Sequence, residues 1–178
     1  MESEIKNYII PAFPLHLAYD YLSATHKADY LRMYFMHFYG GGYSDIKVPT
    51  CNWESSFETL LVNSELWGIG YPEISESGVA NDTVRDKWQE LIGNGCYIMK
   101  PNTNFTREWY QSVHKLLDEK LLELRKNPAK HPRDCKSDIS NYPLEWNEML
   151  GRIFHLLNYK YHTKFDNNLT CPVLNNYL

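Results

Sequence analysis

The sequence has no long run of apolar residues. A membrane-spanning helix needs about 18 consecutive apolar residues, and no such run occurs in the 178-residue chain. The first residues, MESEIKNYIIPAFP, also lack the basic start and long apolar centre of a signal peptide. The sequence therefore predicts a soluble, cytoplasmic protein without a membrane segment.

Cysteine is scarce and scattered. The four cysteines are Cys51, Cys96, Cys135 and Cys171, and no two of them form a C-x-x-C pair. The spacing indicates neither a zinc site nor a compact disulfide framework. We expect reduced and mainly structural thiols.

Positive charge is not in excess either. The chain carries 22 acidic and 18 basic residues, for a net charge of −4, and the two signs are interspersed. Neutralising a nucleic-acid backbone requires a basic field. Nucleic acid is therefore excluded as an expected partner.

Aromatic residues are abundant, at 15% of the chain with 14 tyrosines. A chain of this length fits one domain, here residues 1–178, and chains near this size bury roughly 70% of their unfolded surface. Three prolines and clustered charges between Arg125 and Pro143 predict an exposed loop that joins two halves of this domain.

A helix is predicted from an N-cap at Ser23 or Thr25 to a stop at Gly40. The apolar residues at helical spacing, expected to face the core, are Leu31, Tyr34, Phe35 and Phe38. The opposite side carries Asp29 and Arg32 beside Met33 and Met36. Methionines beside a charged pair indicate a partly covered surface, and an exposed ion pair is the alternative.

Short strands are predicted at 43–49, 65–72 and 95–100. A helix follows from about Asn104 and ends before Pro128, and a last helix covers residues 145–161. The apolar side chains of the first of these helices are Phe105, Trp109, Val113, Leu116 or Leu117, and Leu124; those of the last are Trp146, Leu150, Ile153, Phe154 and Leu157. Helices that alternate with short strands indicate an α/β domain.

The stretch FYGGGYSDIK, residues 38–47, combines three glycines with an aspartate. Open α/β sheets bind ligands outside the ends of their strands, and glycines let a backbone approach a ligand closely. Asp45 at such a strand end can accept ribose hydroxyls or hold a metal. A surface hairpin turn can contain the same residues, so both interpretations stay open on this pattern alone.

Residues 26–47, HKADYLRMYFMHFYGGGYSDIK, resemble the signature of the DXD sugar transferases, in particular glycosyltransferase family 32 and the capsular polysaccharide transferases. The matching residues are Asp29 and Arg32 for Asp-x-x-Arg, Tyr39 to Gly41 for Tyr-Gly-Gly, Tyr43 for the next aromatic residue, and Asp45 for the first acid. The resemblance implies a GT-A fold, a Rossmann-like α/β domain with a short mixed sheet flanked by helices.

The resemblance also implies the partners and the roles of these residues. The donor is a nucleotide-diphosphate sugar, with UDP or GDP as the nucleotide, and the acceptor is a glycan. Asp29 and Arg32 hydrogen-bond donor sugar or ribose hydroxyls, and Tyr43 supports the strand. Asp45 faces the ribose and the metal-bound diphosphate, and is the first candidate for a catalytic residue.

The match continues more weakly downstream. By position, Asn94 falls near the donor or acceptor cleft, and Glu145, Glu148 and His155 are candidates for acceptor-binding or late active-site groups. The alternative is that both glutamates face solvent on a helix and that His155 is a hydrogen-bonded core histidine.

Two departures from the family pattern affect these expectations. Lys47 occupies the position of the acid that ligates Mn²⁺ or Mg²⁺ in the family, so Lys47 can replace the metal by pairing with phosphate. Alternatively, Lys47 points away and Asp45 holds the metal with another side chain such as His155. The signature also begins at residue 26, so part of the usual N-terminal βαβ region is expected to be missing, through truncation or because another segment or subunit completes the site.

The sequence therefore predicts a glycosyltransferase, retaining if the family assignment holds. The alternative function is a non-catalytic sugar- or nucleotide-binding remnant, or an interaction subunit of the same fold.

Overall fold

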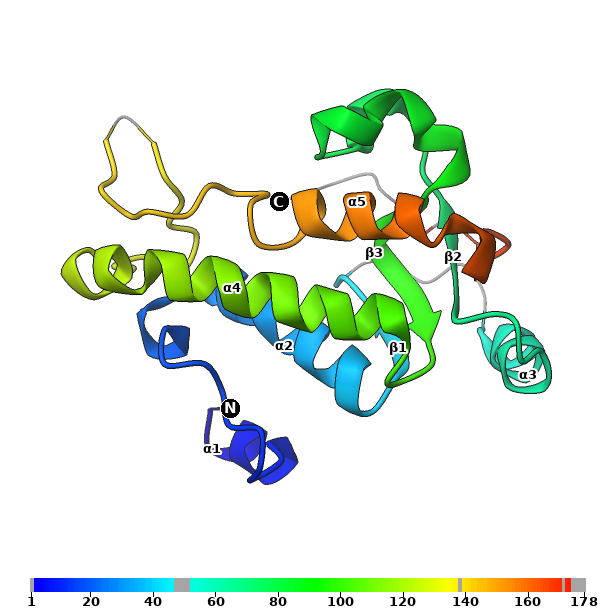
Figure 1. The fold of residues 1–178 in the computed structure, drawn as a ribbon, viewed down its shortest axis with the longest axis horizontal. Coiled ribbons are helices and arrows are strands. Elements are labelled where there is room, and N and C mark those ends of the chain that lie inside the picture. Colours follow the sequence, from blue (N-terminus) through cyan, green and yellow to red (C-terminus); the bar gives the residue numbers. More distant parts are fainter. Residues whose placement is uncertain (1, 47–51, 138, 171, 174–178) are drawn as a thin grey trace.

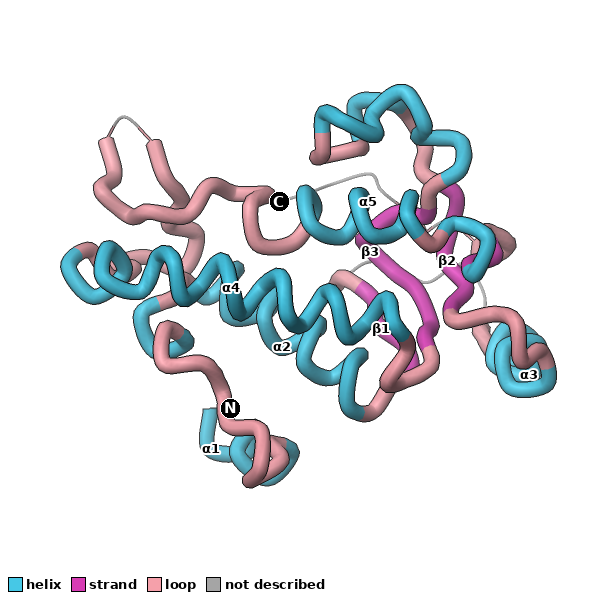
Figure 2. The backbone as a smooth tube through the Cα atoms, viewed as in Figure 1, coloured by secondary structure: helices cyan, strands magenta, loops and turns pink. Residues whose placement is uncertain are grey.

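The computed structural model describes residues 2–46, 52–137, 139–170 and 172–173. The helices are α1 (Glu2–Ile5), α2 (Ala24–Phe38), α3 (Glu54–Val62), α4 (Asn104–Lys126) and α5 (Gly151–Lys160). The strands are β1 (Gly41–Ser44), β2 (Gly68–Pro72), β3 (Ile92–Met99) and β4 (Phe165–Asp166). Figure 2 shows this mixture of helices and short strands, which confirms the α/β class.

The four strands form one mixed sheet in the order β1-β3-β2-β4. The longest strand, β3, is antiparallel to both β1 and β2, whereas β2 and β4 are parallel. The expected short mixed sheet is therefore present. Its pairings are mainly antiparallel, unlike the parallel sheet of a Rossmann fold.

The two faces of β3 serve different parts of the core. Tyr97 and Met99 belong to the large apolar cluster built by α2, α4 and α5, whereas Cys96 and Ile98 pack with Leu60 of α3. Successive side chains of a strand point to opposite faces, which explains this alternation. In Figure 1, the long helix α4 runs beside α2, whereas α3 packs against β2 and β3.

Helix α2 begins as predicted, because the Ser23 side chain accepts a hydrogen bond from the His26 amide. The predicted burial of its faces is wrong in part. Tyr34 is buried, but Leu31, Phe35 and Phe38 are only partly buried. The opposite face is covered, as the methionines beside the charged pair indicated, because Asp29, Met33 and Met36 are buried. The reason is that α2 packs between α4 and the β1 edge of the sheet, so it has two covered sides.

The glycine run ends the helix and starts the strand. Gly40 has φ +64°, and a Cβ there would lie 2.6 Å from the Met99 carbonyl oxygen. Strand β1 begins at Gly41 rather than at Tyr43 and ends before Asp45, although the Asp45 amide still donates to the Gly95 carbonyl at 2.8 Å. The rest of the predicted strand, residues 47–49, lies outside the described residues.

The predicted helix over α4 is confirmed. It begins at Asn104, ends at Lys126, and buries Phe105, Trp109, Val113, Leu117 and Leu124. The last helix is shorter than predicted, since it starts only at Gly151, and residues 146–150 form turns. Trp146 consequently lies 47% exposed instead of on the apolar face of a helix.

Arg125 opens the predicted exposed loop but belongs to α4, and Tyr142 near its end is buried. The described residues between them are mostly exposed and contain no helix. The loop is nevertheless attached to the chain before α2, because the Ala129 amide donates to Tyr21 and the Thr25 amide donates to Pro132.

Several elements were not predicted. Helix α3, strand β4 and a 3₁₀ segment at Asp82–Glu90 all lack a clear periodic pattern in the sequence. Residues 2–23 form helical turns, and the structure describes no strand there. No helix in the described part of the chain has both the length and the apolarity to cross a bilayer.

Candidate functional site

Arg32 is the centre of a cluster of charged and aromatic side chains between α2 and the sheet. Its Nη2 lies 3.0 Å from Oδ1 of Asp29, one turn earlier in the helix, and 3.6 Å from Oδ1 of Asp45, just after β1. The Arg32 side chain is only 10% exposed. One buried guanidinium therefore joins the two predicted acids, which are 16 positions apart in the sequence.

Two tyrosines complete this cluster. The guanidinium carbon of Arg32 lies 4.1 Å from the centroid of the Tyr43 ring, a cation–π geometry. The Tyr43 hydroxyl donates to Oδ1 of Asp45 at 2.7 Å. Tyr97 lies opposite Tyr43 in the β1/β3 register and stacks on it with ring centroids 5.5 Å apart. We call Asp29, Arg32, Tyr43, Asp45 and Tyr97 the arginine cluster.

The local sequence explains how these side chains meet. Asp29 and Arg32 are at i and i+3 of a helix and so share one face. The turn at Gly40 then reverses the chain, so that β1 returns along the same face of α2. Alternate residues of a strand share a face, which places Tyr43 and Asp45 together beside Arg32.

Burial controls the protonation of the acid on α2. The pKa of the Asp29 carboxyl is raised to about 6, mainly by desolvation. The negative charge of Asp45 adds to this increase, and the positive charge of Arg32 opposes it. Burial also raises the pKa of Tyr43, so its hydroxyl keeps its proton and donates to Asp45. The cluster at neutral pH thus contains one fixed cation, two carboxylates and a tyrosine donor.

Two buried polar atoms of the cluster are unsatisfied. Neither Nε of Arg32 nor the hydroxyl of Tyr97 has a hydrogen-bond partner within the described residues. Buried polar groups almost always have a partner, and leaving one without costs about 1–3 kcal/mol. The cluster therefore retains hydrogen-bonding capacity for a polar ligand or ordered water.

Asn94 joins the cluster through its backbone. Its carbonyl oxygen accepts a hydrogen bond of 3.1 Å from Nη1 of Arg32. Its side chain points toward the start of α5, because Nδ2 lies 3.4 Å from the position that a Cβ on Gly151 would take. The donor or acceptor role of Asn94 stays a prediction. Lys47, the remaining residue of the signature, lies outside the described residues.

Glu145, Glu148 and His155, the candidates for acceptor-binding or late active-site groups, contact residues outside the arginine cluster. Glu145 pairs with Arg152 and is 44% exposed, and Arg152 holds the pKa of the Glu145 carboxyl below its usual range. Glu148 accepts a hydrogen bond from the Glu145 amide at 2.9 Å. Neither glutamate lies on a helix, because α5 begins later.

His155 is fully buried. Its Nδ1 accepts a hydrogen bond from the Ala80 amide at 3.1 Å, and its Nε2 lies 3.3 Å from Oε2 of Glu73. Both ring nitrogens therefore face groups other than the arginine cluster. The core-histidine alternative describes His155 better than a shared metal site with Asp45.

The described residues do not form a metal site by themselves. They contain no group of three or more His, Cys, Asp or Glu side chains arranged to hold an ion. Both carboxylates of the cluster already face Arg32, whose charge repels a divalent cation placed at Asp45. The Mn²⁺ or Mg²⁺ implied by the resemblance does not fit this set, and no chemical step is derived through it.

Sequence reasoning missed Tyr97 and Arg152. The alternation of β3 marks Tyr97 only as a core residue, and nothing in the sequence pairs it with Tyr43 before the register is known. Arg152 lies seven positions after Glu145 in the sequence. The two side chains meet because residues 146–150 form turns.

Comparisons with protein-family models, curated proteins and solved structures found nothing that matches this chain. The site is therefore interpreted from its own residues and geometry.

Proposed function

We propose that this chain is a GT-A-type glycosyltransferase that moves a sugar from a nucleotide-diphosphate donor to a glycan acceptor. The observation that carries the proposal is the joining of Asp29, Tyr43 and Asp45 by one buried arginine. These four residues are the ones that the sugar-transferase signature marks as donor-binding. They meet although they come from a helix and from a separate strand.

The chemistry of the cluster suits a polyhydroxylated ligand. Carboxylates accept hydrogen bonds from the vicinal hydroxyls of a sugar. In this proposal Asp45, which is 24% exposed, contacts the donor at the open side of the cluster. Asp29 is more deeply buried and holds Arg32 in position.

Transfer breaks the bond between the anomeric carbon and the β-phosphate oxygen, whose electron pair stays on the diphosphate. A hydroxyl oxygen of the acceptor forms the new bond to the anomeric carbon, and its proton passes to the diphosphate or to solvent. In a retaining reaction the leaving diphosphate assists this attack, so no enzyme nucleophile is assigned. Arg32 and Lys47 are the cations proposed to favour the charged leaving group.

The test is donor binding and turnover with the full chain. Thermal shifts are measured with a panel of UDP-sugars and GDP-sugars, with Mn²⁺ or with EDTA, and donor hydrolysis follows for each one that binds. We expect Arg32→Ala to abolish both signals. Arg85→Ala is the matched control, because Arg85 also pairs with an aspartate three positions earlier, Asp82, but at the surface.

The outcomes separate the possible mechanisms. Full activity of Arg32→Ala overturns the proposed role of the cluster. Turnover in EDTA supports the metal-independent form in which Lys47 pairs with phosphate, and strict dependence on Mn²⁺ contradicts it.

The second candidate is a sugar- or nucleotide-binding module that has lost catalysis. The observation in its favour is that Asp29 and Asp45 both already pair with Arg32 and that the described residues include no metal-binding group. Binding of a nucleotide sugar without hydrolysis or transfer would support this function.

A further inference from the structure

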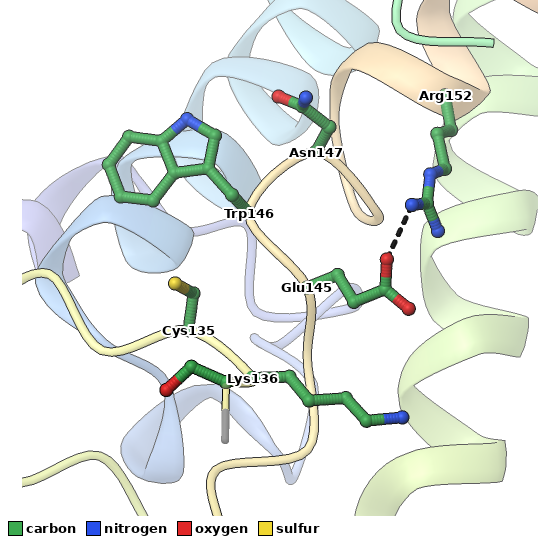
Figure 3. Close-up of a pocket in the computed structure, with 7 residues that line it drawn as sticks. Cys135, Lys136, Glu145, Trp146, Asn147 and Arg152 are labelled. Atoms are coloured by element: carbon green, nitrogen blue, oxygen red, sulfur yellow. Dashed lines mark hydrogen bonds and ion pairs between the residues drawn. The ribbon is translucent and has the colours of Figure 1, made fainter. Parts of the chain in front are cut away.

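An open pocket of about 440 Å³ lies beside the N-terminal end of α5 (Figure 3). Its walls include Lys136, Glu145, Trp146, Asn147 and Arg152. Figure 3 shows the carboxylate of Glu145 directed at Arg152, while Trp146 lies on the other side of the backbone turn. We call this the Trp146 pocket.

The segment that carries Trp146 is firmly held. Leu144 and Met149, on either side of it, are almost completely buried. Nε2 of His26 donates to the Glu145 carbonyl oxygen at 3.3 Å, and the Glu145 amide donates to Glu148. The pocket is therefore preformed, and binding there loses little conformational entropy.

The groups that remain accessible suit a carbohydrate. Trp146 is 47% exposed and offers a flat apolar surface for the C–H face of a sugar ring. Glu145 and Arg152 are each nearly half exposed, and they present planar groups that can hydrogen-bond vicinal hydroxyls. The two charges of this pair compensate each other, and Lys136 adds one positive charge to the lining, so the charges of the wall do not exclude either a neutral or an acidic saccharide.

The pocket adjoins the arginine cluster through Gly151. A Cβ on Gly151 would lie 3.4 Å from Nδ2 of Asn94 and 3.7 Å from Cβ of Asn147. Asn94 in turn accepts a hydrogen bond from Arg32, and Asn147 lines the pocket. The missing side chain of Gly151 thus brings the two sites into near contact.

We infer that the Trp146 pocket is the acceptor subsite and that it binds a saccharide stacked on Trp146. This inference rests on the proposed function, because the arginine cluster is taken as the donor site. It adds the place where the acceptor binds and the residue that contacts it most extensively.

The experiment probes the full chain on a glycan array of neutral and acidic mono- to tetrasaccharides, with and without UDP and GDP. We expect retention of a subset of these glycans. Trp146→Ala should weaken this retention by about tenfold, and Trp146→Phe, which keeps a ring, by less than about threefold. Leu122→Ala, an exposed apolar change on α4 at a residue that does not line the pocket, should have no effect.

A second readout uses the best-retained glycan as acceptor in a transfer assay. Trp146→Ala should raise the KM for the acceptor and leave donor hydrolysis unchanged. An array without retained glycans, or equal retention by wild type and Trp146→Ala, overturns the inference.

The inference and the proposed function fail in different ways. Trp146-dependent glycan binding in a chain that neither binds nor hydrolyses nucleotide sugars leaves the saccharide site standing and removes the transferase proposal. The converse result is donor hydrolysis that requires Arg32, with acceptor kinetics that do not respond to Trp146→Ala. That result supports the transferase proposal and removes the saccharide site at Trp146.

Discussion

The guanidinium carbon of Arg32 lies 4.1 Å from the centroid of the Tyr43 ring, while the Tyr43 hydroxyl donates a hydrogen bond to Asp45. Arg32 is thereby held between an aromatic ring and two carboxylates, of which Asp45 is the more exposed. This arrangement fixes the position of a cation at the edge of the sheet. The same contacts therefore contribute both to the stability of the fold and to the geometry of the candidate site.

Removing Arg32 should destabilise the protein as well as abolish donor binding. Arg32→Ala leaves the buried carboxylate of Asp29 without its cation, and breaking a buried pair in this way costs about 3–5 kcal/mol. Adding Asp29→Asn should recover part of this loss, because it removes the uncompensated charge. Urea unfolding of the two single variants and the double variant measures the coupling. Strictly additive effects would show that the two side chains do not interact.

The hydroxyl of Tyr43 should contribute more to stability than the hydroxyl of a surface tyrosine. Tyr43→Phe keeps the surface that stacks on Arg32 but deletes the hydrogen bond to Asp45, at a cost of about 1–2 kcal/mol. Tyr39→Phe is the control, since Tyr39 also donates a hydrogen bond of 2.8 Å but at the surface. Equal unfolding midpoints for the two variants would contradict this prediction.

Stability should fall in mild acid because of His114. Burial and, to a smaller extent, the adjacent His16 lower the pKa of His114 to about 4, so the folded protein holds this ring neutral. In the unfolded chain the ring titrates near 6.5, and the unfolded state therefore binds more protons between these values. The stabilisation is complete above about pH 6.5 and is lost as the pH falls toward 4.

The size of this effect is about 1–2 kcal/mol, because the ring is partly exposed. His114→Gln should remove it, and the difference between wild type and variant as a function of pH isolates the contribution of this ring. A difference that stays constant between pH 4 and pH 7 would refute the assignment.

Asp29 should give the opposite pH dependence. Its pKa is raised to about 6 from an ordinary value of 3.8, so the folded state binds more protons than the unfolded state between these values. This contribution favours folding at low pH and is lost as the pH rises from about 4 to 6. Asp29→Asn should gain stability relative to wild type as the pH increases through this range. Unfolding curves at pH 4, 5, 6 and 7 test the sign.

The two glycines at the start of β1 should respond differently to alanine. Both have positive φ, a backbone strain of about 1–3 kcal/mol for a residue with a side chain. At Gly40 a Cβ would also lie 2.6 Å from the Met99 carbonyl oxygen and from Cδ of Pro101, whereas at Gly41 it would meet no atom within 4 Å. Gly40→Ala should therefore lower the unfolding temperature clearly more than Gly41→Ala. The reverse order would mean that contacts around Gly40 do not hold the turn.

Prediction from sequence succeeded where a contact depends on a helical or strand period. The pairing of Asp29 with Arg32 and the apolar side of α4 are of this kind, because three or four residues complete a turn of helix. It failed for the apolar stripe of α2, because Leu31, Phe35 and Phe38 were expected to face the core and are only partly buried. The predicted start of the last helix was also wrong, because residues 146–150 contain apolar residues at helical spacing but form turns.

The sequence by itself determined the α/β class, the start of α2 at its serine cap, and the four donor-site candidates around the glycine turn. Only the tertiary structure decided that Tyr97 stacks on Tyr43 and that Glu145 pairs with Arg152 away from Arg32. It likewise placed His155 against Glu73. The physical reason is that strand register and loop paths are set by packing between distant segments, and a local period contains no information about which segments those are.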